Sequence, residues 1–177
     1  MAVHFGDRQF EVLCALVSAN KLLNSKILWQ SERPVYQDAV LTEVLVNLNF
    51  CLLHAKFNLK SEIVFSDDII IRTEISNVTE LIRFFRNAAC HHESPNKYFE
   101  DINNPKHNKS IFNTMFGKGI EQIDSRCESK YDDDVAFFCG INVLYLKRHI
   151  ERAYDEVVKV HDGFIFHHVL TAFNLIN

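Results

Sequence analysis

The stretch Asn77-Val-Thr-Glu-Leu-Ile-Arg-Phe-Phe-Arg-Asn-Ala-Ala-Cys-His91 predicts a short helix around which the rest of the chain is organised. Asn77, with Glu80 three residues later, has the spacing of a capping box, which marks a helix start. Apolar residues that recur at helical period predict the buried face, namely Val78, Leu81, Ile82, Phe85 and Ala89. A separate stripe is formed by Arg83, Arg86, Asn87 and Cys90. The segment therefore predicts a helix that packs through one side and carries polar groups on another.

Arg86 and His91 form a candidate functional pair at the end of this helix. On an ideal helix their side chains point about 140° apart. They converge if the helix turns near Cys90, and Pro95 shortly afterwards favours such a break. The same spacing also fits a solvated arginine and a loop histidine that stabilises the helix C-terminus. The pair thus indicates either a site or a structural helix end.

Helical periodicity also marks the first third of the chain. A first helix is expected after Gly6, up to about residue 23. A second is expected from Pro34, which suits a first helical turn, to about residue 58. Its apolar face is formed by Leu41, Leu45, Leu48, Leu52 and Ala55. Two long helices of this kind are typical of a bundle.

The second half of the chain predicts a hairpin and one more long helix. Residues 111–123, with the glycine turn Gly117-Lys-Gly119, are typical of a small β-hairpin. Residues 132–160 predict a final helix whose three leading aspartates suit the helix dipole. Arg152 and Glu156 on this helix are spaced for an i,i+4 ion pair. Its apolar stripe comprises Cys139, Val143, Leu146, Ile150, Ala153, Val157 and Val160.

The remaining segments are less regular. Residues 61–76 fit either a strand or an irregular cover, and residues 92–110 are expected to form a long polar loop. The apolar tail 164–173 is expected to dock on its own domain or on a partner subunit. Together the elements predict one domain over residues 1–177, with a mainly α fold. The expected architecture is an up-and-down helical bundle with a small β-hairpin inserted before the last long helix.

Composition narrows the class of protein. Hydrophobic residues make up 47% of the 177 residues, so the chain should fold rather than remain disordered. A net charge of −4 argues against a protein that coats nucleic acid nonspecifically, although it allows a local basic cleft. The five cysteines are odd in number and lack a Cys-x2-Cys pair. We see no signal peptide or membrane-spanning run, so we expect reduced thiols in a cytoplasm and no membrane association.

The segment Arg86-Asn87-x3-His91, at the end of an amphipathic helix, resembles the motif of the HEPN superfamily. Residues 77–91 are also similar to a group of small stand-alone bacterial HEPN proteins that are often carried on plasmids. This similarity continues through residues 112–120, 132–140 and 145–153, and so spans roughly residues 77–160. The resemblance implies a HEPN-like helical bundle and a hydrolase that cleaves RNA.

RNA carries its own nucleophile, the 2′-hydroxyl beside the scissile phosphate. Histidine suits proton transfer near neutral pH, and arginine suits phosphate because its planar guanidinium stays charged. The resemblance implies that His91 moves the proton, Arg86 binds the phosphate and Asn87 orients the group. It also implies a homodimer with a composite cleft and products that end in 2′,3′-cyclic phosphate. HEPN toxins that are inactivated by nucleotidylation carry a tyrosine where this chain has Glu93, so that control route is not expected here.

His92, Lys118 and Arg148 are further candidates for RNA binding or support of the site. No metal or other cofactor is expected, because no histidine pair has the i,i+4 spacing of helical zinc sites. The chain therefore predicts a cytoplasmic, dimeric, metal-independent endoribonuclease, in a defence or toxin-type setting with a possible antitoxin partner. The alternatives are a HEPN module that binds RNA, nucleotide or protein without cleaving, and a structural dimer in which Arg86 and His91 stabilise a helix end.

Overall fold

Helices and two small β-sheets share the fold. The computed structural model describes residues 7–31, 34–90, 113–120 and 128–161. Helices account for 58% of the described chain, and five short strands form two antiparallel sheets. The predicted mainly α, HEPN-like up-and-down bundle is therefore wrong, and the protein is an α+β mixture.

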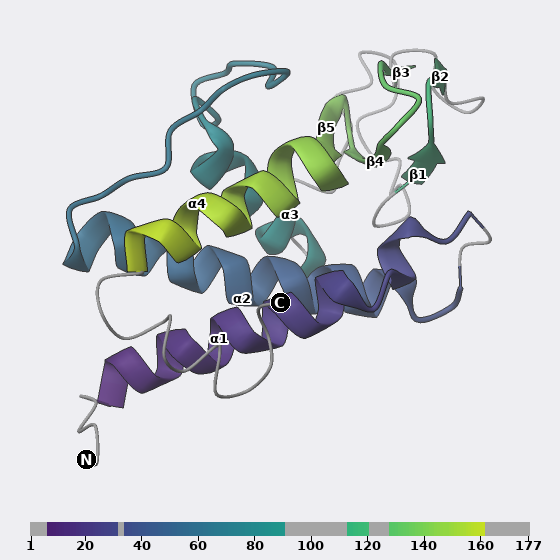
Figure 1. Ribbon diagram of the computed structural model, residues 1–177. Coiled ribbons are helices and arrows are strands. Elements are labelled where there is room, and N and C mark those ends of the chain that lie inside the picture. Colours follow the sequence, from purple (N-terminus) through teal and green to yellow (C-terminus); the bar gives the residue numbers. More distant parts are fainter. Residues whose placement is uncertain (1–6, 32–33, 91–112, 121–127, 162–177) are drawn as a thin grey trace.

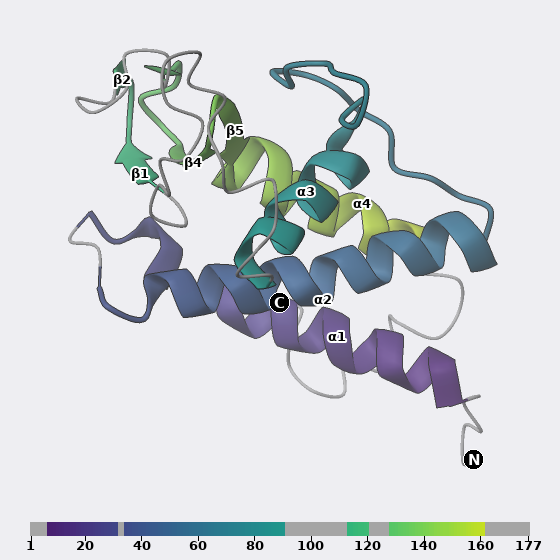
Figure 2. The ribbon, with the colours of Figure 1, turned by 180° about the vertical axis from the view of Figure 1, so that it is seen from behind.

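Helix α2 (Gln37–Asn58) lies at the centre of the structure. Figures 1 and 2 show α1 (Asp7–Asn24) along one side of α2, with α3 (Val78–Cys90) and α4 (Arg152–His161) on the other. The predicted apolar face of α2 is buried in full, which confirms Leu41, Leu45, Leu48, Leu52 and Ala55 as core residues. In length and composition α2 also meets the criteria for a membrane span. However, α2 packs against α1, α3 and α4, and its apolar face is buried in the core of the fold.

The start of α3 confirms Asn77 as the N-cap. Asn77 Oδ1 accepts a hydrogen bond from the backbone N–H of Glu80 at 3.0 Å. The Glu80 carboxylate does not return to Asn77, as a capping box requires. Its Oε2 instead accepts bonds from the backbone N–H and the hydroxyl of Ser76, at 2.9 and 2.7 Å. These bonds lower the pKa of Glu80 and fix the entry of the chain into α3.

The predicted hairpin over residues 111–123 is wrong in its pairing. Its described strands, β1 (Asn113–Phe116) and β2 (Gly119–Ile120), belong to different sheets. β1 pairs with β4 (Val135–Cys139), and β2 pairs with β3 (Glu128–Ser129). The glycine turn does not fold back on β1, because the N–H of Gly117 bonds to the carbonyl of residue 134 at 3.0 Å. Residues 111–112 and 121–123 lie outside the described residues.

The predicted final helix over residues 132–160 is wrong in its first half. That segment forms β4 and then β5 (Asn142–Tyr145), with a turn at Gly140, where φ is +63°. Every residue of both strands is buried, so the segment has two apolar faces and its apolar spacing fits a helix only by coincidence. A π-helical turn, η3 (Leu146–Glu151), follows and leads into α4. The strands gather at the end of α4 where η3 enters it (Figure 1).

The two faces of the β4–β5 hairpin pack into two different clusters of apolar side chains. Phe137 and Leu144 join the main core with the helices. Phe138 and Tyr145 form a smaller cluster on the other face. The short 3-10 helix η1 (Ile27–Trp29) is tied to the same region, because the indole of Trp29 donates to the carboxylate of Glu151 at 3.1 Å. The hairpin thus positions the final helix against α2.

Candidate functional site

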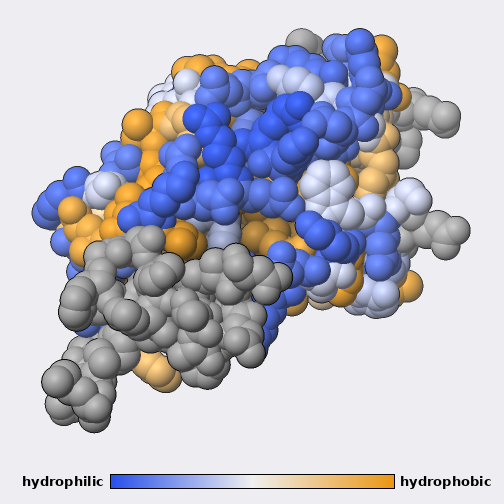
Figure 3. Space-filling model, in the orientation of Figure 1, coloured by the Kyte–Doolittle hydropathy of each residue, from blue (hydrophilic) through white to orange (hydrophobic). Residues whose placement is uncertain are grey.

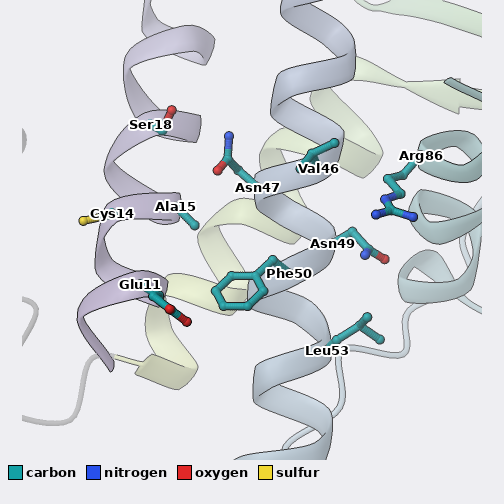
Figure 4. Close-up of a pocket in the computed structure, with 10 residues that line it drawn as sticks. All are labelled: Glu11, Cys14, Ala15, Ser18, Val46, Asn47, Asn49, Phe50, Leu53 and Arg86. Atoms are coloured by element: carbon teal, nitrogen blue, oxygen red, sulfur yellow. The ribbon is translucent and has the colours of Figure 1, made fainter. Parts of the chain in front are cut away.

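Three helices line a groove of about 690 Å³ over α2. From α1 come Glu11, Cys14, Ala15 and Ser18, and from α2 come Val46, Asn47, Asn49, Phe50 and Leu53. Arg86 of α3 closes the groove on its far side (Figure 4). The α1 residues are spaced i, i+3, i+4 and i+7, so they lie on one stripe of α1, in which Cys14 is exposed and points away from α2 (Figure 4). A volume of this size lies within the range of small-molecule pockets.

Arg86 is held in the groove by a single side-chain bond. Its Nη1 donates to Asn87 Oδ1 at 3.0 Å. Its Nε is buried and has no hydrogen-bond partner. Within the described residues Arg86 makes no ion pair with a carboxylate, so its guanidinium keeps an unused donor and an unneutralised charge.

Asn49 faces Arg86 from the central helix (Figure 4). The residue is only 8% exposed, and its Oδ1 has no hydrogen-bond partner. Buried amide oxygens without partners are uncommon, since burial without a bond carries a free-energy cost. Sequence reasoning missed Asn49. The available signal was an asparagine directly after Leu48, next to the apolar face of the helix.

Asn87 does not line this groove. It lines a second, smaller hollow of about 390 Å³ together with Thr73, Glu74 and Arg83. The two neighbouring motif residues therefore face different hollows, and the bond between Arg86 Nη1 and Asn87 Oδ1 joins them. Asn87 therefore contacts Arg86 without lining the groove itself.

The other predicted site residues are not brought to the groove. His91 and His92 lie outside the described residues, and so does the predicted convergence of His91 with Arg86; the last described residue of α3 is Cys90. Lys118 is exposed between β1 and β2 and does not line the groove. Arg148 lies at the start of the final helix and does not line it either.

Arg148 is engaged by two aspartates instead. Its Nη1 bonds to Asp134 at 3.0 Å and its Nη2 bonds to Asp133 at 2.8 Å. The guanidinium also lies 3.6 Å from the ring centroid of Tyr131. Hydrogen bonds from Lys147 and Arg148 lower the pKa of Asp133 to about 2. Figure 3 shows hydrophilic side chains over much of the face that carries α4.

Three described histidines lie elsewhere in the fold. His149 is fully buried, and its Nδ1 accepts the N–H of Tyr145 at 3.1 Å, so its Nε2 carries the hydrogen and donates to the carbonyl of Asp67 at 2.9 Å. Burial lowers the pKa of His149. His54 and His161 join α2 to α4, with 3.1 Å between Nδ1 and Nε2, and burial lowers both pKa values. None of these three rings lines the groove.

The described chain holds four cysteines, and its possible metal ligands are dispersed. No disulfide is recorded for the four described cysteines, which are Cys14, Cys51, Cys90 and Cys139. Across the described ranges, His, Cys, Asp and Glu side chains form no group of three or more that is arranged to hold a metal ion.

Comparison of the chain with known protein families, curated proteins and solved structures finds no match.

Proposed function

We propose that the protein is a metal-independent endoribonuclease of the HEPN type that uses Arg86, Asn87 and His91. The 2′-oxygen of the RNA forms a bond to the adjacent phosphorus, and the bond from phosphorus to the 5′-oxygen breaks. A proton passes from the 2′-hydroxyl to the leaving 5′-oxygen, with His91 in the transfer. Arg86 stabilises the negative charge on the phosphate, and Asn87 orients Arg86. The product ends in a 2′,3′-cyclic phosphate.

The observation that carries this proposal is the state of Arg86 in its groove. Arg148 and Arg152 are each paired with two carboxylates, whereas Arg86 is bonded only to an amide among the described residues. A guanidinium that no carboxylate neutralises keeps its full charge for a phosphate. The resemblance of residues 77–91 to the HEPN motif supplies the second support.

The proposal includes a setting for the enzyme. Two copies of the chain form a homodimer in which both motifs line one cleft, and the dimer acts in a bacterial cytoplasm. A defence or toxin-type system, with a neutralising antitoxin, fits an enzyme that cleaves cellular RNA.

A non-catalytic module that binds RNA or nucleotide, or that mediates dimerisation, is the second candidate. One observation favours it: among the described residues that line the groove there is no histidine. The described lining of such a groove suits an anion, which Arg86 binds through its charge.

The test is cleavage of labelled single-stranded RNA and of tRNA in the presence of EDTA. Wild type is compared with His91→Ala and Arg86→Ala, with Arg83→Ala as the matched control on the same helix. Circular dichroism and the sedimentation of each protein verify equal folding and equal oligomeric state.

Cleavage by wild type and Arg83→Ala that leaves cyclic-phosphate ends, and that is lost in the other two variants, is the expected result. RNA binding without cleavage by any of the proteins would favour the binding module. Cleavage that survives in His91→Ala would remove this residue from the reaction.

A further inference from the structure

The groove holds one unused hydrogen-bond donor and one unused acceptor on facing helices. The donor is Arg86 Nε and the acceptor is Asn49 Oδ1, and both are buried without a partner. Figure 4 shows the Asn49 amide directed from α2 toward the Arg86 guanidinium. Other buried polar atoms also lack a partner, Asn142 Oδ1 among them, but Asn142 lines neither this groove nor the smaller hollow beside Asn87.

A group that both accepts and donates hydrogen bonds satisfies both atoms at once. A hydroxyl accepts a hydrogen bond from an N–H and donates one to a carbonyl oxygen. A phosphate or carboxylate satisfies Arg86 but offers nothing to Asn49, because it only accepts. An ammonium group satisfies Asn49 and is repelled by Arg86. The chemistry of the pair therefore favours a group that both donates and accepts, and in RNA the 2′-hydroxyl is such a group.

We propose that Asn49 is a positioning residue that binds the 2′-hydroxyl of an RNA substrate jointly with Arg86 Nε. This inference rests on the proposed function, in which that same hydroxyl is the nucleophile. It adds a residue from α2, outside the Arg-Asn-x3-His motif, and it gives the protein a way to distinguish RNA from DNA.

The geometry of the guanidinium accommodates both roles of Arg86. Nη1 is bonded to Asn87. Nε then serves the hydroxyl, and Nη2 remains for a phosphate oxygen, as a guanidinium has five donors in one plane. Admission of the hydroxyl requires a movement of the Arg86 side chain, since Nε is buried. The bond to Asn87 limits how far the guanidinium moves.

The rest of the groove suits a nucleotide. Phe50 lies beside Asn49 on α2, and its ring faces into the groove (Figure 4). Aromatic rings are common stacking partners for unpaired bases. Val46 and Leu53 extend this apolar floor by one turn on either side. An RNA strand thus meets a polar end at Arg86 and Asn49 and an apolar surface next to it.

The test measures binding and cleavage separately. The affinity of the full-length protein for a short single-stranded RNA and for DNA of the same sequence is determined by fluorescence anisotropy at one salt concentration. Wild type is compared with Asn49→Ala and Asn49→Ser. Asn142→Ala is the matched control, because it also removes a buried amide with an unpartnered Oδ1 but lies outside the groove. Cleavage is followed on the same RNA, and on RNA with 2′-fluoro groups as a probe that cannot donate.

The expected result is that wild type and Asn142→Ala prefer RNA over DNA, and that both Asn49 variants lose about 2- to 10-fold of that preference while binding DNA as before. The 2′-fluoro substitution should weaken binding to wild type and have a smaller effect on Asn49→Ala. An RNA preference that is unchanged in folded Asn49→Ala or Asn49→Ser would overturn the inference and assign Asn49 a structural role.

Failure of the inference and failure of the proposed function give different results. If wild type cleaves RNA and the Asn49 variants keep the RNA preference, the enzyme stands and the inference falls. If no protein cleaves but the RNA preference depends on Asn49, the hydroxyl site stands and the catalytic assignment falls. If wild type shows neither cleavage nor a preference for RNA, both fall.

Discussion

Asp134 Oδ2 accepts hydrogen bonds from both the backbone N–H and the Nη1 of Arg148, at 3.2 and 3.0 Å. Asp134 Oδ1 accepts the backbone N–H groups of Val135 and Lys147, each at 2.8 Å. The side chain is fully buried and lies at the start of η3, where free N–H groups and the helix dipole favour a negative charge. A residue that precedes the β4–β5 hairpin therefore caps the helix that follows it.

Replacement of Asp134 by alanine should destabilise the fold strongly. The change leaves buried N–H groups unpaired and removes a carboxylate partner of Arg148, which should lower the free energy of unfolding by about 3–5 kcal/mol. Urea denaturation measures this quantity. Asp133→Ala is the control: its carboxylate also pairs with Arg148 but is 54% exposed, so its loss should matter much less. Equal effects of the two changes would contradict the capping role.

His149 should make the protein less stable in mildly acidic solution. Burial lowers its pKa below 6.5 in the folded state, whereas the unfolded chain binds the proton near that value. The stabilising effect is therefore complete above a pH of about 6.5 and is lost as the pH falls toward the folded pKa.

The check is the free energy of unfolding of wild type and His149→Gln between pH 7 and pH 5. The wild-type curve should fall more steeply, because the variant lacks the group that titrates. His54→Gln provides the comparison from the half-buried histidine pair, and should reduce the slope less. Parallel curves for wild type and His149→Gln would show that His149 does not account for the acid sensitivity.

Glycine is needed at position 140 because of the backbone conformation, and not because a side chain lacks room there. Its φ is +63°, and a Cβ placed there meets no atom within 4 Å. Gly140→Ala should therefore cost about 1–2 kcal/mol of stability through the left-handed conformation alone. Gly140→Asn should cost less, because asparagine tolerates this region better. Thermal unfolding distinguishes the two, and equal losses would indicate a steric cause instead.

Arg86 should matter for RNA cleavage and little for stability. Its one side-chain bond is to its neighbour Asn87, and its Nε is unpartnered, so Arg86→Ala should change the free energy of unfolding by less than about 0.5 kcal/mol. Cleavage should fall by about 10²- to 10³-fold. Arg86→Lys should restore only part of the rate, since lysine lacks the planar guanidinium. A variant that unfolds would support the structural role of the helix end.

The helical half of the fold was predictable because local signals and packing agree there. Asn77 does cap α3, and Val78, Leu81, Ile82 and Phe85 are buried as the period indicates, although Ala88 is buried more fully than Ala89. The ion pair from Arg152 to Glu156 also forms, at 3.0 Å. Each of these features depends on neighbours within one or two helical turns.

The β-rich half was not predictable, because its local sequence pattern does not distinguish a strand from a helix and its strand pairing depends on distant residues. Val135 to Cys139 are all buried, so no alternation distinguishes a strand from a helix there. The helix predicted to begin at residues 132–134 was wrong, because strand β4 follows them directly. The helix that Asp134 caps, however, begins only after the intervening hairpin. Pairing between β1 and β4 likewise depends on residues far apart in the chain.

The candidate site was predictable only in part. Arg86 and Asn87 stand out in the sequence because of their spacing to His91. Asn49 does not, because nothing in a helical pattern indicates that an amide oxygen at a buried position will remain without a partner. Arg148 was a candidate because of its charge, and only the fold shows that two aspartates already engage it.

The central place of α2 has a consequence for synthesis of the chain. Ribosomes complete α2 before they make α3 and α4, which cover it. Until then, apolar side chains such as Val44, Leu48 and Leu52 have only α1 as a neighbour among the four helices. A nascent chain at this stage exposes the kind of surface that chaperones bind and that leads to aggregation. The N-terminal helices therefore acquire their native shielding only late in translation, when the final helix has emerged.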